Sequence, residues 1–175
     1  MAQKELHLGV TAALDGSLEG LLPVFEAALS LGYEVSVLAV GTQAMQQRVM
    51  TLQESYPTQL NILEATSLHR ERIDRRADVL LSPTLPDDSL LQRCKRYHTV
   101  LLCPAGGPVT DYDGVKETGT GFTYDPSNSW TAVRALIRAA ETHHFPYDWQ
   151  SLQDRLAELL QAQRTSTLMT AAVAR

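Results

Sequence analysis

The chain has 175 residues, of which 44% are apolar and 20% charged, and its formal net charge at pH 7 is −5. These values fit one globular domain with a sizeable core, and we expect a single domain over residues 1–163 followed by a flexible tail over residues 164–175. They exclude nucleic acid and membrane as partners, because no basic surplus exists to neutralise phosphates and no apolar run reaches the roughly 18 residues of a membrane span.

Short apolar runs rich in valine and leucine alternate with amphipathic stretches along the whole chain. They predict six strands, at residues 6–12, 33–40, 60–63, 79–81, 100–103 and 122–124. Helices are predicted between them, and Pro23 either starts the first helix or kinks its first turn. Gly32 is expected to close that helix, Ser67 to cap the polar helix before the fourth strand, and Asp87 or Asp88 to cap the next one.

Two helices are predicted after the last strand. The first opens at residues 125–127, and helical spacing predicts a buried side that carries Trp130, Val133, Ile137 and Ala140. The second follows Pro146 and carries an apolar stripe of Trp149, Leu152, Leu156, Leu159 and Leu160. We interpret Trp149 and its leucines as core, with a partner-binding face as the alternative.

Strands that alternate with helices through short loops indicate a parallel sheet. We therefore predict an α/β fold, a Rossmann-like open and mostly parallel sheet with helices on both faces. Ligands in such folds lie beyond the carboxyl ends of the strands. A glycine-rich stretch over residues 100–126 begins with the fifth strand and continues beyond its carboxyl end. No GxGxxG or Walker motif is present, so a standard dinucleotide or nucleoside triphosphate site is not expected.

Several short motifs resemble the C-terminal half of bacterial glycogen synthases and plant starch synthases, which are retaining glucosyltransferases of the two-domain GT-B type. The stretch at residues 96–100 looks like the family's RYGTV, and residues 105–109 resemble its TGGL loop. The acids at 111–113 followed by Gly-Thr-Gly-Phe at 119–122 are similar to its acidic loop and GTGF strand. The resemblance covers about residues 6 to 160 and implies the GT-B C-terminal fold.

The family's functional side chains are mostly replaced at the matching positions. Ala12 stands where the family has the arginine that neutralises the diphosphate, and Ser17 stands near its lysine. Leu85 replaces the glutamate that holds the donor sugar, and Asp87 and Asp88 stand where phosphate would dock. A leaving diphosphate needs cations or strong donors, so the resemblance implies a catalytically degenerate domain, without catalytic residues of its own.

Two functional classes follow from this resemblance. The first is a non-catalytic interaction or regulatory module in the cytoplasm, whose partner is another protein, a second copy of the chain or a glucan. The second is the sugar-nucleotide or glucan-binding half of a split glucosyltransferase that needs a separate N-terminal half. No cofactor is expected in the first class, whereas ADP or ADP-glucose would bind in the second, at the candidate residues Gly106, Gly107, Thr11 and Ser82.

Three other groups of residues could carry chemistry, and each has a simpler structural interpretation. His143 and His144 together with Asp148 could suggest a metal site, but their spacing does not provide a third ligand. We therefore expect a polar helix end and no metal. The acids Asp111, Asp113 and Glu117 lack the glycine and final glutamate of an EF-hand, and we expect a solvated loop. Cys94 and Cys103 fit no metal or CxxC spacing, which predicts reduced, buried thiols.

Overall fold

A single parallel sheet forms the centre of the molecule. The computed structural model describes the backbone of residues 6–12 and 15–173, and side chains as far as residue 162. The strand order is β3-β2-β1-β4-β5-β6, and every neighbouring pair is parallel. The strands are β1 (His7–Val10), β2 (Glu34–Leu38), β3 (Leu60–Leu63), β4 (Val79–Leu81), β5 (Val100–Pro104) and β6 (Phe122–Tyr124). The predicted fold class is confirmed.

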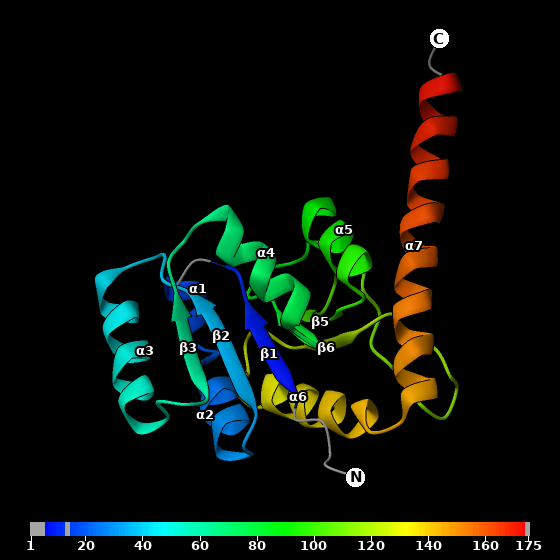
Figure 1. Ribbon diagram of the computed structural model, residues 1–175. Helices are drawn as coiled ribbons and strands as arrows, with labels where there is room; N and C mark the ends of the chain where they lie inside the picture. Colours follow the sequence, from blue (N-terminus) through cyan, green and yellow to red (C-terminus); the bar gives the residue numbers. More distant parts are fainter. Residues whose placement is uncertain (1–5, 13–14, 174–175) are drawn as a thin grey trace.

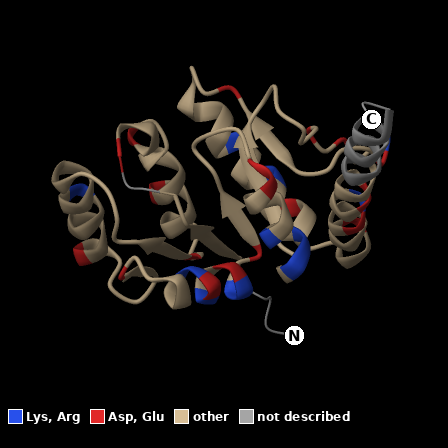
Figure 2. Cartoon of the chain, turned by 90° about the horizontal axis from the view of Figure 1, so that it is seen from above, with Lys and Arg blue, Asp and Glu red and all other residues tan. Residues whose placement is uncertain are grey.

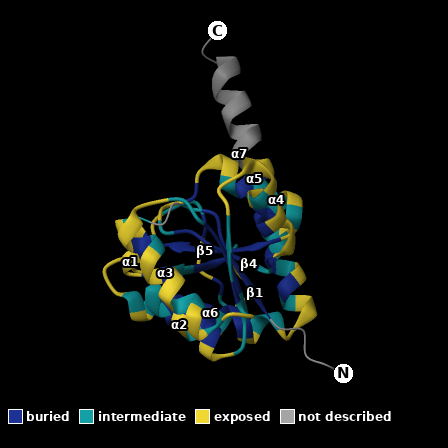
Figure 3. Cartoon of the chain, turned by 60° about the vertical axis from the view of Figure 1, so that its left-hand side comes forward, coloured by how far each residue is buried: buried dark blue, intermediate teal, exposed yellow. Residues whose placement is uncertain are grey.

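Helices cover both faces of this sheet (Figure 1). They are α1 (Gly16–Glu19), α2 (Leu22–Ser30), α3 (Gln43–Ser55), α4 (Ser67–Arg76), α5 (Asp88–Tyr97), α6 (Ser129–His143) and α7 (Pro146–Val173). Residues of α2, α3 and α6 share one buried apolar cluster, and residues of α4, α5 and α7 share another. Figure 3 shows the buried strands enclosed between these helices.

Glycine in the central strand allows α4 to pack closely on the sheet. A Cβ at Gly9 would lie 2.7 Å from Ile73 Cγ2 and 2.8 Å from Ala77 Cβ. The neighbouring residues Leu8 and Val10 point to the opposite face, where they are fully buried. The short distance between β1 and α4 brings the inward side chains of α4 close to the carboxyl end of β1.

The predicted helix starts are confirmed for α2 and α5 and are wrong for α4 and α6, where Asn128 rather than a residue of 125–127 caps the helix. Pro23 lies in the first turn of α2, which confirms the first of its two interpretations, and Gly32 has φ +86° directly after that helix. The Asp87 side chain caps α5. The cap of α4 is Thr66 rather than Ser67, because the Thr66 side chain accepts a hydrogen bond from the backbone N–H of His69.

The predicted buried side of α6 is wrong at two positions. Trp130 is 71% exposed and Ile137 is 41% exposed, whereas the face toward the sheet carries Leu136 and the alanines Ala132, Ala135, Ala139 and Ala140. Alanine lets α6 approach β6 and α2 closely, so close packing outweighs side-chain size in setting the orientation. The prediction followed the largest apolar residues, Trp130 and Ile137, and these lie on a stripe next to the alanine face that packs on the sheet.

The last helix matches its predicted stripe, since Trp149, Leu152, Leu156 and Leu160 are buried. Its backbone is helical to Val173. The flexible tail predicted over residues 164–175 lies outside the residues whose side chains are described, so it stays a prediction. Within the described part of the chain, no helix is both long and apolar enough to cross a membrane.

Charged residues of both signs are interspersed over the ribbon (Figure 2). On α4, Arg75 bonds to Glu71 with 2.9 Å between Nη2 and Oε1, and Arg76 bonds to Glu34 across to β2. Both arginines are exposed. These contacts agree with the solvated face that the alternating acids and bases of α4 indicate.

Candidate functional site

The four predicted site residues lie at one edge of the sheet. Thr11 follows β1, Ser82 follows β4, and Gly106 and Gly107 follow β5. These strands are neighbours in the order β1-β4-β5, so their carboxyl ends lie side by side, and we call the region beyond these ends the crevice. The topology therefore brings the predicted residues together, and the chemistry depends on the side chains between them.

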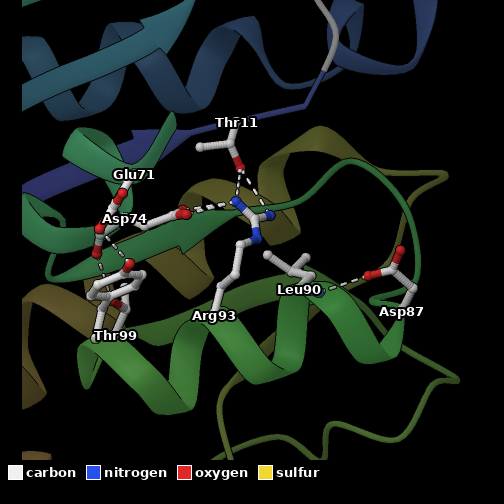
Figure 4. Close-up of polar contacts among 8 residues, drawn as sticks. Thr11, Glu71, Asp74, Asp87, Leu90, Arg93 and Thr99 are labelled. Carbon is white, nitrogen blue, oxygen red and sulfur yellow. Dashed lines mark hydrogen bonds and ion pairs between the residues drawn. The ribbon is translucent and has the colours of Figure 1, made fainter. Parts of the chain in front are cut away.

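An arginine that the motif comparison does not select lies across this crevice. Arg93, from α5, places Nη1 at 3.2 Å and Nη2 at 3.3 Å from Thr11 Oγ1 (Figure 4). The same Nη1 lies 2.9 Å from both carboxylate oxygens of Asp74, a residue of α4 that is 1% exposed. Arg93 thus connects α4, α5 and the end of β1 by hydrogen bonds.

The charge of Arg93 is balanced inside the fold. Burial raises the pKa of the Asp74 carboxyl, and the Arg93 guanidinium beside it opposes that rise. The backbone carbonyl of Asp74 also accepts a hydrogen bond from Thr99 Oγ1, at 3.1 Å. A guanidinium that already has a buried carboxylate partner is a weaker ligand for a diphosphate than a free cation.

The polar groups around Ser82 are also bonded within the chain. Ser82 Oγ donates to the carbonyl of Thr84 at 2.8 Å, and the Tyr124 hydroxyl donates to the Ser82 carbonyl at 2.9 Å. Burial raises the pKa of the Tyr124 phenol, so it remains neutral at physiological pH. Ser82 therefore stabilises its own loop and the end of β6.

The two glycines after β5 differ in their surroundings. Gly106 has φ +97°, and a Cβ there would meet nothing within 4 Å. A Cβ at Gly107 would lie 3.0 Å from Leu85 Cδ2 and 3.6 Å from Pro86 Cδ. Leu85, which is 52% exposed, thus lies against the glycine loop. The position at which the family resemblance implies a sugar-binding carboxylate holds an apolar contact.

Two helix starts at the crevice use carboxylates of the chain as caps. Asp87 Oδ1 accepts a hydrogen bond from the Leu90 N–H at 2.7 Å, at the start of α5 (Figure 4). Asp15 Oδ1 accepts from the Ser17 N–H at 2.8 Å, and its hydrogen bond with the Ser17 hydroxyl is the main cause that lowers the pKa of Asp15. Helix N-termini attract phosphate through free N–H groups, and here carboxylates already accept from them.

Curated glycogen synthases match most of the chain. The chain is 26% identical over 132 residues to glycogen synthase 1 of Synechocystis, a match that covers 70% of the chain and 27% of the relative. It is 24% identical over 140 residues to glycogen synthase of Lactobacillus acidophilus, covering 76% of the chain and 29% of that enzyme. No family model matches the sequence. The matched part is thus less than a third of either relative.

Solved glycosyltransferase structures share the fold. A glycosyltransferase from Rickettsia africae superimposes with a TM-score of 0.64 at 13% identity, covering 91% of the chain and 44% of that structure. HepE from Anabaena, in complex with UDP and glucose, superimposes with a TM-score of 0.61 at 13% identity, covering 95% of the chain and 48% of that structure. The chain is a glycogen synthase-like domain with the GT-B type of fold.

In this glycogen synthase-like domain, the glycines of the GTGF stretch serve the packing of the backbone. A Cβ at Gly119 would lie 2.4 Å from the carbonyl oxygen of Asp111, and one at Gly121 would lie 2.7 Å from the carbonyl oxygen of Leu101. Real Cβ atoms do not approach so closely, so both positions require glycine. These two glycines are explained without any ligand.

Arg138 of α6 holds the acidic loop of the domain. Its Nη1 lies 2.8 Å from Asp111 Oδ2, and its Nη2 donates to the carbonyl oxygen of Tyr112. Asp113 accepts from the N–H groups of Val115 and Lys116, which lowers the pKa of Asp113. The acids of this loop are thus used in turns and in one ion pair with α6. Local sequence gives no signal for Arg138, because it is 27 residues from Asp111.

The remaining candidates are a histidine at the amino end of β4 and two buried cysteines. His143 Nε2 is 3.5 Å from Asp78 Oδ1, at the amino end of β4, and its ring meets the edge of Trp149. Cys94 and Cys103 are free and buried, and burial raises the pKa of each thiol to about 12. Such thiols are protonated at neutral pH and are poor nucleophiles.

Proposed function

We propose that this glycogen synthase-like domain is a non-catalytic interaction module that has kept the fold of a sugar-nucleotide site without its chemistry. The observation that carries the proposal is the Arg93 side chain, which lies between Thr11 and Asp74 across the crevice. Arg93 is already paired with Asp74, and the helix starts of α1 and α5 are capped by Asp15 and Asp87. A cytoplasmic location belongs to this proposal, since free cysteines are typical of that compartment.

Electrostatics supports the absence of catalysis. Asp15, Asp87 and Asp88 all lie at helix starts on the edge where a diphosphate would have to bind, and like charges at short range repel. The leaving diphosphate of a glucosyl transfer needs its charge stabilised. The described crevice offers Arg93, and Asp74 already offsets its charge.

Isothermal titration calorimetry tests this proposal. The chain is titrated in turn with ADP, ADP-glucose and UDP-glucose, and we expect no saturable heat up to about 1 mM ligand. The Ala12→Arg/Leu85→Glu variant, which restores two side chains of the resemblance, is the matched comparison. Saturable binding by the unmodified chain below millimolar would overturn the proposal.

A second candidate is the sugar-nucleotide half of a split glucosyltransferase. It is favoured by a groove of about 610 Å³ between α4 and α5, lined by Ala65, Arg70, Arg93, Arg96 and Tyr97 among others. Arg70 and Arg96 are exposed there, and no ion pair binds them within the described residues. This candidate predicts glucosyl transfer from ADP-glucose or UDP-glucose once an N-terminal GT-B half is added. No turnover under that condition would exclude it.

A further inference from the structure

The outer surface of α6 carries large apolar side chains. Trp130 is 71% exposed and Ile137 is 41% exposed, and Phe145, just beyond the end of the helix, is 60% exposed. Residues spaced four, three and four apart lie on one stripe of a helix, so Arg134 and Glu141 share the stripe with Trp130 and Ile137. Exposed apolar side chains in a row are typical of an interface.

The two charges on this stripe have no partner within the described residues. Arg134 and Glu141 make no ion pair or side-chain hydrogen bond in that part of the chain, in contrast to Arg138 one residue after Ile137, which binds Asp111. One side chain is positive and the other negative. The stripe therefore has Ile137 at its centre, an unpaired positive charge at Arg134 on one side and an unpaired negative charge at Glu141 on the other.

The arrangement is symmetric along the helix. Counted in residues, Trp130 and Phe145 share the midpoint of Arg134 and Glu141, between Ile137 and Arg138, and Phe145 lies just beyond the end of α6. A twofold axis through that midpoint would align two antiparallel copies of α6. Arg134 of each copy would then face Glu141 of the other, Ile137 would lie at the centre, and Trp130 would lie near Phe145.

A hollow beside the stripe has room for side chains of such a partner. It has a volume of about 1050 Å³ and lies between α6 and the loop at residues 111–114, with Trp130, Ile137 and Glu141 in its wall. The loop itself is fixed by Arg138. A preformed hollow beside an apolar stripe reduces the ordering that association requires.

We propose that a second copy of this chain covers α6, and that the two copies form a twofold dimer with reciprocal Arg134–Glu141 ion pairs around Ile137. The proposal names the partner of the interaction module described above and rests on that function. The self-complementary charges favour a second copy over an unrelated protein, because two antiparallel α6 helices place each Arg134 opposite a Glu141 without any further matching of surfaces.

Sedimentation velocity over about 1–300 μM chain tests the proposal, since this range covers the micromolar dissociation constants expected of a small interface. We expect a reversible monomer–dimer equilibrium. Arg134→Glu and Glu141→Arg should each weaken dimerisation at least about tenfold, because each turns two attractive pairs into two repulsive ones. The double variant Arg134→Glu/Glu141→Arg should recover to within about threefold, since the reciprocal pairs are restored with exchanged signs.

Further variants separate this surface from general effects of charge. Ile137→Asp should abolish the dimer by placing two charges at the centre, and Arg72→Glu on α4 is the matched reversal that should leave it unchanged. Circular dichroism checks that each variant is folded. An unmodified chain that stays monomeric over the whole range, or a double variant that does not recover, would overturn the dimer. Neither result bears on the calorimetric test, so the two proposals fail separately.

Discussion

The glycine loop after β5 and the crevice side chains opposite it differ in what they retain of the glycogen synthase pattern. In the loop, the backbone is kept, and Gly119 and Gly121 are required by carbonyl oxygens less than 3 Å from a Cβ position. Across the crevice, Leu85 stands at the carboxylate position of the pattern and lies against Gly107, and Arg93 pairs with Asp74 beside Thr11. Gly107 meets Leu85 at the carboxyl ends of the strands, whereas Gly119 and Gly121 come just before β6 and lie toward its amino end.

The difference shows that glycine motifs and ligand chemistry are separable. A glycine that is required by a neighbouring carbonyl remains necessary after the ligand is lost, because its role is to let two backbones meet. A cation or carboxylate has no such second role and can be replaced. A glycine pattern alone is therefore weaker support for a binding site than the charged side chains that surround it.

The strongest way to sharpen this comparison is to substitute two glycines that differ in packing. Gly119→Ala should lower the free energy of unfolding by about 3 kcal/mol, because its Cβ would overlap the Asp111 carbonyl and its φ is +99°. Gly106→Ala, with φ +97° and open space, should lower it by only about 1 kcal/mol. Urea denaturation measures both. Equal losses would contradict the packing argument.

The next test concerns the crevice. Arg93→Met should lower the free energy of unfolding by about 2 kcal/mol, since it leaves the buried Asp74 carboxylate without a partner. The loss is smaller than for a fully buried pair because the Arg93 side chain is 24% exposed. Arg96→Met, at an exposed arginine of the same helix, is the control and should change stability by less than about 0.5 kcal/mol. An unchanged stability of Arg93→Met would contradict a stabilising pair between Arg93 and Asp74.

A smaller effect is expected where the family motif has glycine and this chain has histidine. His98 ends α5 with φ +54°, a left-handed conformation that a glycine adopts without strain. His98→Gly should therefore raise the free energy of unfolding by about 1 kcal/mol. His144→Gly is the matched control, because His144 ends α6 with φ −73° and should gain nothing. Thermal denaturation of both variants checks the result.

The smallest effect is expected at the amino ends of the strands, opposite the crevice, where the first residue of β1 is a buried histidine. His7 is 5% exposed, and its Nε2 lies 2.9 Å from Ser36 Oγ. Burial, followed by the charge of Arg76, lowers the pKa of His7 below 6.5. The unfolded chain therefore takes up the proton first as the pH falls, and stability decreases below pH 6.5 until the lower folded pKa is reached.

The pH effect should not exceed about 1 kcal/mol over the first pH unit below 6.5. Urea denaturation at pH 7.5, 6.5 and 5.5 measures it, and His7→Gln should reduce the slope. Stability that rises as the pH falls through this window, and does so only with His7 present, would show that the pKa shift has the opposite sign. The other histidines are present in both chains and cancel in the comparison.

The sheet could be predicted from the sequence because its signals are local. The strands at 60–63, 79–81 and 122–124 have the predicted bounds, and the strand ends place Thr11, Ser82 and Gly106 at one edge. Each strand is a short apolar run between turn residues, and the sequence of alternating elements implies the parallel topology. The same local signals predicted a cap of α5 at Asp87 or Asp88, and Asp87 is that cap.

The side chains that fill the site could not be predicted, since they meet through tertiary contacts. Arg93 and Asp74 are 19 residues apart, and Arg93 and Thr11 are 82 apart. The one available signal was Asp74 itself, which follows the inward Ile73 and precedes Ala77 by three positions, so helical spacing turns it toward the sheet. The orientation of α6 was missed because alanine contributes little to an apolar pattern, although it allows the closest approach to a sheet.

The central pairing of β1 with β4 has a consequence for how the chain folds. Every other strand pair joins consecutive strands, whereas β1 and β4 are far apart in sequence, and the His7 N–H meets Asp78 Oδ2 across 71 residues. Loop closure over such a distance is entropically unfavourable, so the local βαβ units are expected to form before this seam. The Arg93–Thr11 contact would then form late, as part of the step that joins two half-sheets.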